Sequence, residues 1–231
     1  MTILDDLKTI TTKPELAKLI KVKSSALTYT LYKLDPATLY TTFTIPKKSG
    51  GERTILAPSA RLKNIQKGLS KLLLDCIDEI NKAKQKEGEK YRPTLSHGFT
   101  RKGSIITNAM MHLDKKNVLN IDLADFFDSF NFGRVRGFFI KNKHFGLDPQ
   151  IATVIAKIAC YDNKLPQGSP CSPVITNLIT HSLDIRLASL AKKHSSIYSR
   201  YADDLTFSTR ERKFSAQIVL KKIMNASLGK N

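Results

Sequence analysis

Residues 196–208 read SIYSRYADDLTFS, in which two short runs of strand-forming residues flank a tight turn. The β-branched and aromatic residues of 196–201 and 205–208 favour two strands, and the turn between them holds Asp203 and Asp204. Two adjacent carboxylates repel each other unless a cation lies between them. Aspartate is also common in turns for conformational reasons alone, so a functional interpretation of this pair needs support from the rest of the chain.

A third carboxylate ends an apolar strand upstream of this hairpin. Residues 117–123 alternate, with apolar side chains at 119, 121 and 123 on one face and Asn120 and Asp122 on the other. A carboxylate beside so much apolar surface is costly unless something compensates its charge. Carboxylates are hard oxygen ligands that select Mg²⁺ or Mn²⁺, and two such ions can activate a hydroxyl and stabilise a leaving pyrophosphate.

The remaining sequence predicts an α+β fold. A Pro/Gly-rich turn is expected at 165–173, and Ser172 is expected to cap the helix that follows it. Hydrophobic periodicity and turn residues predict short helices over 1–39, a β-hairpin over 40–57, a long amphipathic helix over 62–86, helical structure over 132–160 and a final helix over 215–224.

The charge of the chain favours a polyanionic partner. Its 231 residues include 38 Lys plus Arg against 20 Asp plus Glu, a net charge of +18. The excess lies in residues 40–102 and 185–231, on either side of a nearly neutral centre, although solvated helix faces account for part of it. Three cysteines without metal-site spacing, and no apolar segment of signal or membrane-spanning length, predict a soluble, cytoplasmic protein.

Three motifs together resemble the conserved blocks of reverse transcriptases. NIDLADFF at 120–127 resembles their first catalytic block, LPQGSP at 165–170 their nucleotide-pocket block, and YADD at 201–204 their second catalytic block. The blocks occur in the family's order, and the resemblance covers roughly residues 40–210. It implies the fingers and palm of a right-hand polymerase, with antiparallel palm strands and flanking helices.

The resemblance also divides the chain. It implies an N-terminal helical segment at 1–39, fingers at 40–116 and an incomplete palm at 117–231. The family continues with further palm strands, a VTG element, a primer grip and a helical thumb, which are absent from this sequence. We therefore expect this portion alone to hold a primer–template duplex weakly.

By the same resemblance, Asp122, Asp203 and Asp204 bind two Mg²⁺ ions, for which Mn²⁺ can substitute, and the carbonyl of Leu123 is a further ligand. The residues assigned to the incoming deoxynucleotide are Lys47, Arg53, Asp125, Phe126, Phe127, Gln167 and Gly168. Arg53 matches the triphosphate clamp, assisted by Lys47 or Lys48, and Gln167 matches the contact to the 3′-hydroxyl region. Phe127, five residues after Asp122, matches the steric gate that excludes a ribose 2′-hydroxyl. The alternative for a phenylalanine here is a place in the core, which we expect for Phe126 or Phe130.

One further motif points to the retron branch of the family. NAMMH at 108–112 resembles the NAxxH element of retron enzymes, so Asn108 and His112 are expected to contact RNA; the alternative is an ordinary polar helix face. A retron enzyme copies its own structured non-coding RNA into RNA-linked DNA from dNTPs, primed by a 2′-hydroxyl, and acts in phage defence with an effector protein. The alternatives are a scaffold that binds RNA–DNA or an effector without catalysis, and a group II intron enzyme, which the NAxxH element disfavours.

Overall fold

The computed structural model of the protein describes residues 2–46, 50–86 and 95–212. The chain forms two compact units, each discontinuous in sequence. The helix-rich unit comprises Met1–Tyr91 and Asp125–Thr176, and the sheet unit comprises Arg92–Ala124 and Asn177–Asn231. The linear division predicted at residues 40 and 117 stays a prediction. Lys47, Lys48 and the predicted helix at 215–224 lie outside the described residues.

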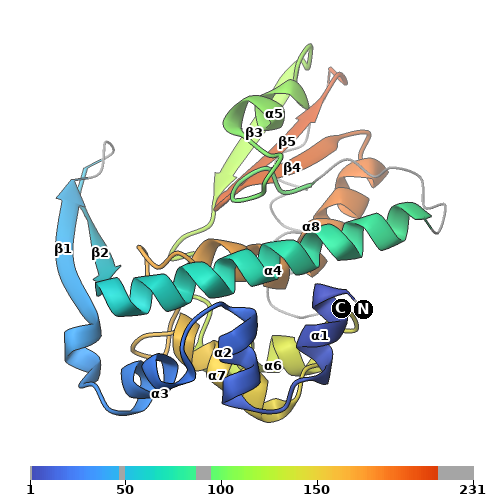
Figure 1. Ribbon diagram of the computed structural model, residues 1–231. Helices are drawn as coiled ribbons and strands as arrows, with labels where there is room; N and C mark the ends of the chain where they lie inside the picture. The colour runs from blue at the N-terminus through green and yellow to red at the C-terminus, as the bar shows by residue number, and fades with distance from the viewer. Residues whose placement is uncertain (1, 47–49, 87–94, 213–231) are drawn as a thin grey trace. The chain divides into compact units, whose positions relative to one another are not determined.

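The N-terminal part of the helix-rich unit consists of short helices packed along one long helix (Figure 1). The long helix α4 spans Ala60–Lys86, and Glu79 on it accepts hydrogen bonds from the backbone nitrogens that begin α1. The short elements are α1 (Ile3–Thr9), α2 (Lys13–Leu19), α3 (Ser24–Tyr32) and a 3-10 turn (Pro36–Leu39). Capping boxes begin α1 and α2, which explains why such short sequences are helical and confirms the prediction for 1–39.

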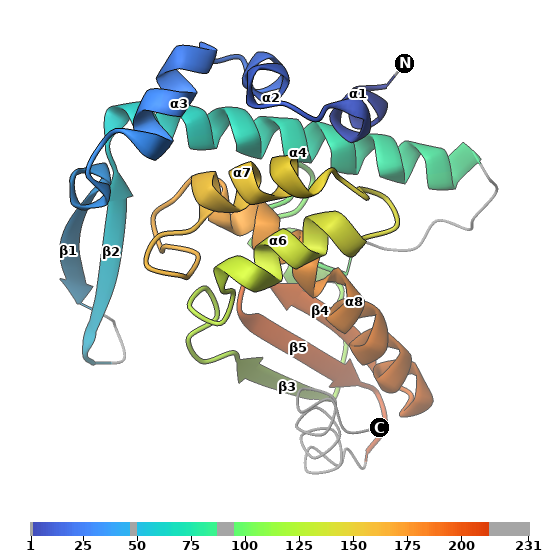
Figure 2. The same cartoon turned by 90° about the horizontal axis from the view of Figure 1, so that it is seen from below.

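The helical structure predicted over 132–160 is confirmed, and it divides into two helices. Helix α6 spans Phe132–Lys141 and α7 spans Pro149–Ala159, and they pack against each other below α4 (Figure 2). Asp148 caps α7 through its side chain, and Pro149 occupies the first turn. A cap followed by proline starts a new helix, so hydrophobic spacing alone failed to show the break.

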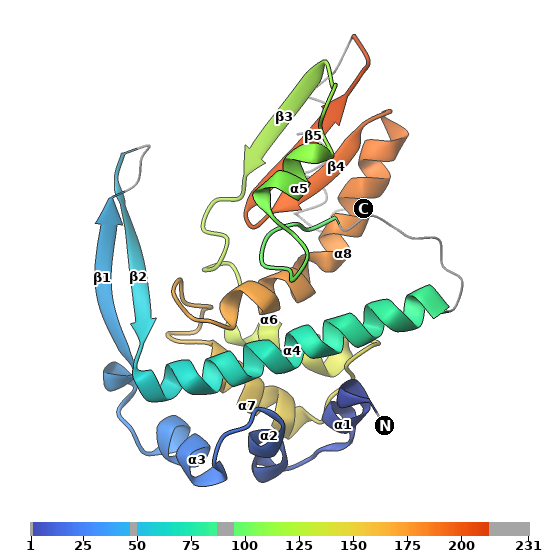
Figure 3. The ribbon, with the colours of Figure 1, turned by 45° about the horizontal axis from the view of Figure 1, so that its top comes forward.

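The predicted hairpin at 40–57 is confirmed as two antiparallel strands, β1 (Tyr40–Pro46) and β2 (Glu52–Pro58). It extends away from the start of α4 (Figure 3). Arg53 lies opposite Ile45 near the turn, and its side chain is exposed.

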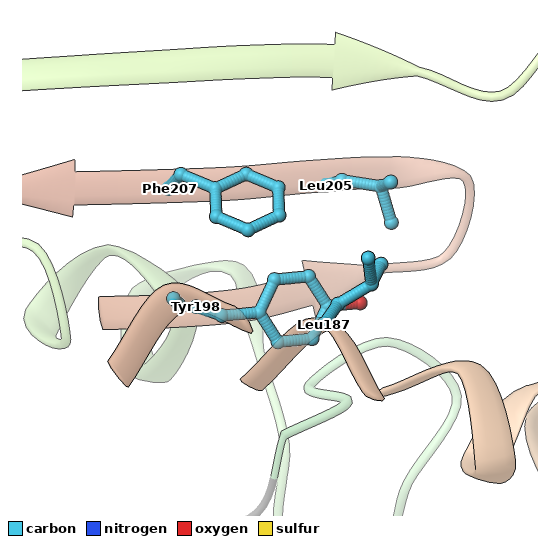
Figure 4. Packing of buried hydrophobic residues seen from close by; sticks show 5 residues of the cluster. Leu187, Tyr198, Leu205 and Phe207 are labelled. Carbon is cyan, nitrogen blue, oxygen red and sulfur yellow. The ribbon is translucent and has the colours of Figure 1, made fainter. Parts of the chain in front are cut away.

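The sheet unit is built on three antiparallel strands in the order β3-β5-β4. They are β3 (Asn117–Asp122), β4 (Ile197–Tyr201) and β5 (Asp204–Thr209), as the sequence predicted. One face of the sheet packs on α8 (Ser172–Lys193), where Leu187, Ala191, Tyr198, Leu205 and Phe207 form a buried cluster (Figure 4). Leu119, Ile121 and Leu123 pack against that cluster, which confirms the predicted alternation of β3.

The helix cap predicted at Ser172 is not found. Ser172 is the first residue of α8 rather than the residue before it, and its hydroxyl donates a hydrogen bond to the Pro166 carbonyl. Cys76, Cys160 and Cys171 are free thiols. Across the described ranges of the chain, every helix is too short or too polar to cross a lipid bilayer.

Candidate active site

The strand register of the sheet unit brings the predicted metal ligands to one end of the sheet. Asp122 ends β3 directly opposite Asp204, the first residue of the central strand β5. The backbone nitrogen of Leu123 donates a hydrogen bond to the Asp203 carbonyl at 3.1 Å, which ties the end of β3 to the turn. Because opposite residues of an antiparallel pair project from the same face, the carboxylates of Asp122 and Asp204 lie on the side of the sheet away from α8.

This arrangement concentrates negative charge. Partial burial raises the pKa of Asp204, and the neighbouring carboxylates of Asp203 and Asp122 raise it further. Like charges placed directly across a strand pair destabilise it, so a counter-ion would relieve a cost that the fold otherwise carries.

The donor set fits a hard divalent cation in its chemistry. Asp122 and Asp204 are exposed and Asp203 is half-buried, so the carboxylate oxygens are accessible, and oxygen ligands of this kind suit Mg²⁺. Within the part of the chain that the structure describes, no three acidic, histidine or cysteine side chains are already gathered around one point. The backbone therefore places the three carboxylates near one another, and the charge of a bound ion would have to draw their side chains together.

The phenylalanines after β3 divide into core and accessible residues. In the helix-rich unit, Phe126 and Phe130 are buried, with ring centroids 5.2 Å apart in an edge-to-face contact. Phe127 is half-buried, and its ring contacts that of Phe126 at 5.5 Å. Asp125, at the start of this turn, is exposed and has a left-handed φ of 49°. Phe127 is thus the one of these three phenylalanines that is partly exposed, while Phe126 and Phe130 are buried.

The predicted nucleotide-pocket loop lies against the β1–β2 hairpin within the helix-rich unit. The backbone nitrogen of Leu56 on β2 donates a hydrogen bond to the Gln167 carbonyl at 2.8 Å. Gly168 has φ of 117°, and a Cβ atom there would lie 2.6 Å from the Leu56 carbonyl oxygen. The strand that carries Arg53 and the loop that carries Gln167 are therefore joined, and only glycine allows so close an approach.

We expect Gly168→Ala to destabilise the protein by about 1–3 kcal/mol, because the new methyl group meets the Leu56 carbonyl in a backbone conformation strained for alanine. Thermal or denaturant unfolding measures this directly. Gly137→Ala is the matched control: its Cβ would meet nothing within 4 Å on helix α6, so we expect a gain of about 0.5–1 kcal/mol. Equal stability of the two variants would contradict the close packing of this loop.

The two residues predicted to contact RNA have partners inside the sheet unit. They belong to α5 (Ile105–Met110) and the turn after it. The Ser199 hydroxyl donates to the side-chain oxygen Oδ1 of Asn108 at 2.6 Å. Nε2 of His112 lies 2.7 Å from the Ser199 hydroxyl, and Nδ1 lies 2.6 Å from the Ser208 hydroxyl. Their role in RNA recognition stays a prediction. In the folded chain their polar groups hold α5 against β4 and β5.

This network surrounds both ring nitrogens of His112. Because Ser199 gives its hydrogen to Oδ1 of Asn108, its oxygen can accept from Nε2 of His112, and a neutral ring can accept from Ser208 at Nδ1. Burial lowers the pKa of His112, which favours the neutral ring, and electrostatic repulsion from His97 and Lys115 lowers it further.

We expect this histidine to make stability depend on pH. Because the pKa of His112 is lower in the folded chain, the unfolded chain takes up the proton first, and stability falls as pH drops below about 6.5. Unfolding midpoints measured between pH 7.5 and 5 should show a smaller acid loss for His112→Gln than for the unmodified protein. His181→Gln, which removes a histidine of α8 instead, is the comparison, and the smaller acid loss is expected in the His112 variant. An unchanged acid loss in the His112 variant would refute the assignment.

Sequence reasoning missed one group beside the carboxylates. Arg200 and Asp184 are fully buried and form an ion pair within the sheet unit. The available signal was an arginine at an inward position of β4, between Tyr198 and Ala202, where a strand facing a core should carry apolar residues.

Known proteins resemble this chain over most of its length. The family described as "Reverse transcriptase (RNA-dependent DNA polymerase)" matches residues 45–228. The Retron Ec86 reverse transcriptase of Escherichia coli is 35% identical over 201 residues, which cover 86% of this chain and 57% of that protein. Two proteins of Myxococcus xanthus are also similar. The Retron Mx65 reverse transcriptase is 36% identical, covering 73% of this chain and 40% of its own length. The Retron Mx162 reverse transcriptase is 34% identical, and the match covers 86% of this chain and 42% of that protein. The chain thus spans about half the length of these relatives.

Proposed function

This chain belongs to the reverse transcriptase family, among its retron-type members, and on that premise we propose that it is the polymerase portion of an RNA-directed DNA polymerase. The observation that carries the proposal is the register that sets Asp122 opposite Asp204, next to Asp203. Three carboxylates at one end of a sheet repel one another, whereas phosphoryl transfer requires a site that gathers positive ions around phosphate oxygens.

We assign Asp122, Asp203 and Asp204 as the metal ligands, with the Leu123 carbonyl beside them. Two divalent ions held there, Mg²⁺ or in its place Mn²⁺, would supply Lewis acids for a primer hydroxyl and for the leaving pyrophosphate. The contribution of the protein is then positioning: β3 and β5 fix the spacing of two carboxylates, and the turn fixes the third.

The proposal gives separate roles to residues of the helix-rich unit. Arg53, exposed on β2, supplies a guanidinium fork that suits a triphosphate, with Lys47 as a second charge. Phe127 presents an accessible ring that excludes a 2′-hydroxyl, and Gln167 contacts the sugar of the incoming dNTP. Asp125, Phe126 and Gly168 shape the turns that hold these side chains.

As in retron enzymes, we propose that the template and primer are one structured non-coding RNA and that the product is DNA linked to it. The net charge of +18 suits this polyanionic partner. Action in anti-phage defence together with an effector protein, within the cytoplasm, belongs to the same proposal.

DNA synthesis by the full chain tests the proposal. The protein is supplied with dNTPs, Mg²⁺ and a DNA-primed poly(rA) template, and extension is followed on a gel. We expect extension that stops when EDTA removes the metal. Tight, salt-sensitive binding of the primed template without any extension would instead favour the non-catalytic scaffold.

A further inference from the structure

The buried ion pair of the sheet unit is bidentate. Nε and Nη2 of Arg200 donate to the two carboxylate oxygens of Asp184 at 2.7 and 2.8 Å. The Arg200 side chain is 0% exposed and that of Asp184 is 2% exposed. Removing two charges from water is expensive, and a well-packed apolar pair is often at least as stable, so stability alone does not explain why the pair is there.

The third nitrogen of the guanidinium connects this pair to the carboxylate turn. Nη1 of Arg200 donates to the Ala202 carbonyl oxygen at 2.8 Å and to Oδ1 of Asn177 at 3.1 Å. The Ala202 carbonyl belongs to the peptide bond that joins Ala202 to Asp203. The buried arginine therefore holds the peptide from which a proposed metal ligand extends.

That turn adopts a conformation that needs holding. Tyr201 and Asp204 pair as the last and first residues of their strands, which leaves Ala202 and Asp203 as a two-residue turn. Ala202 has φ of 56°, a left-handed value that is costly for a residue with a Cβ atom. Such a conformation persists only where the surroundings fix it, and the bond from Arg200 is one such restraint.

A second restraint comes from the segment beside β4. The Leu95 carbonyl accepts from the Arg200 backbone nitrogen, and the His97 nitrogen donates to the Arg200 carbonyl, both at 2.8 Å. Gly98 passes so close to the turn that a Cβ atom there would lie 2.5 Å from the Ala202 nitrogen. Nδ2 of Asn177 donates to the Gly98 carbonyl at 2.7 Å. Asn177 therefore accepts a hydrogen bond from Arg200 through Oδ1 and also holds the segment that contains Gly98.

Tyr198 completes the network from the core side. Its hydroxyl donates to Oδ1 of Asp184 at 2.8 Å. Burial raises the pKa of Tyr198 and the Asp184 carboxylate raises it further, so the phenol keeps its proton and remains a donor. The Asp184 carboxylate thus has three donors, which hold the guanidinium plane in one orientation.

We propose that Arg200 is a positioning residue that sets the Ala202–Asp203 peptide for metal binding, with Asp184, Tyr198 and Asn177 fixing its orientation. The proposal rests on the proposed function of the three aspartates. Groups that orient a metal ligand from behind act on affinity and rate without touching the ion, and their loss typically weakens either by about 10–100-fold.

The test is the affinity of the full chain for Mn²⁺, measured by the electron paramagnetic resonance of the free ion, alongside the thermal midpoint and steady-state DNA synthesis. Arg200→Lys keeps a charge for Asp184 but cannot reach both Asp184 and the Ala202 carbonyl. Tyr198→Phe keeps the ring in the core and removes one donor to Asp184. Leu187→Ala is the control, because it destabilises the same core without any hydrogen bond to the network.

We expect Arg200→Lys to weaken Mn²⁺ binding about tenfold or more and Tyr198→Phe to weaken it several-fold. The kcat for DNA synthesis should fall in parallel while the KM for the primed template stays unchanged. Leu187→Ala should lower the thermal midpoint and leave Mn²⁺ affinity within about twofold of the unmodified protein at a temperature where all are folded. If Arg200→Lys does not fold, Tyr198→Phe decides the question against the same control.

Two results would overturn the inference. One is Mn²⁺ affinity in the network variants equal to that of the unmodified protein. The other is an affinity loss in Leu187→Ala as large as theirs, because metal binding would then follow general stability. If the unmodified chain itself neither binds Mn²⁺ nor makes DNA, the proposed function fails as well, which distinguishes that case from the first two.

Discussion

Asp203→Asn is expected to abolish DNA synthesis, with a loss of about a thousandfold or more, while binding of primed template survives. Asparagine has nearly the same shape but lacks the charge that attracts a divalent ion, and a metal contribution of several kcal/mol corresponds to a factor of that size. Extension on a DNA-primed poly(rA) template with Mg²⁺ measures the activity, and a filter-binding assay measures retention of the template. The turn should tolerate the substitution, because asparagine is as common in turns as aspartate.

Asp114→Asn is the matched control. Asp114 is an exposed aspartate of the same sheet unit, with a left-handed φ of 56° that asparagine also adopts readily. It should retain wild-type synthesis. Wild-type synthesis by Asp203→Asn would refute the catalytic assignment of the YADD turn, and equal losses in both variants would show that net charge matters more than position.

The second large effect is expected on the choice of sugar. Phe127→Ala should raise the ratio of ribonucleotide to deoxynucleotide incorporation by about 100-fold, because removing the ring removes a steric clash with the 2′-hydroxyl. We choose Phe127 over its neighbours because Phe126 and Phe130 are buried against each other, whereas Phe127 is only partly buried.

The measurement is kcat/KM for rNTP and for dNTP on the same template. Their ratio does not depend on the fraction of active protein, so partial unfolding of a variant cannot mimic the result. Phe127→Tyr retains the ring and should keep the preference for dNTPs. An unchanged ratio in Phe127→Ala would move the steric gate to another residue.

Local periodicity was enough to predict the elements that carry the site. The alternation in 117–123 predicted which face of β3 bears Asp122, because successive side chains of a strand must point to opposite faces. The two runs around Asp203 and Asp204 predicted the hairpin, and the three motifs predicted the family. These features depend on neighbours along the chain, which a single sequence contains in full.

Other features depended on residues far apart in sequence. The break between α6 and α7 escaped a reading based on hydrophobic spacing, since both helices bury apolar residues with the same period. The helix-rich unit combines Met1–Tyr91 with Asp125–Thr176 because helices of the two segments pack against each other. The sequence around each helix does not show which helix from elsewhere in the chain will pack on its apolar face.

The sequence by itself therefore determined the chemistry of the chain: which aspartates it carries, on which faces of which strands, and in which family. Only the tertiary structure decided how those groups are held. In the fold, Asn108 and His112 form hydrogen bonds with Ser199 and Ser208. Arg200 lies where it can donate hydrogen bonds both to the Asp184 carboxylate and to the Ala202 carbonyl. The physical reason is that a buried polar group must find partners wherever the fold brings them, and those partners are fixed by packing rather than by distance along the chain.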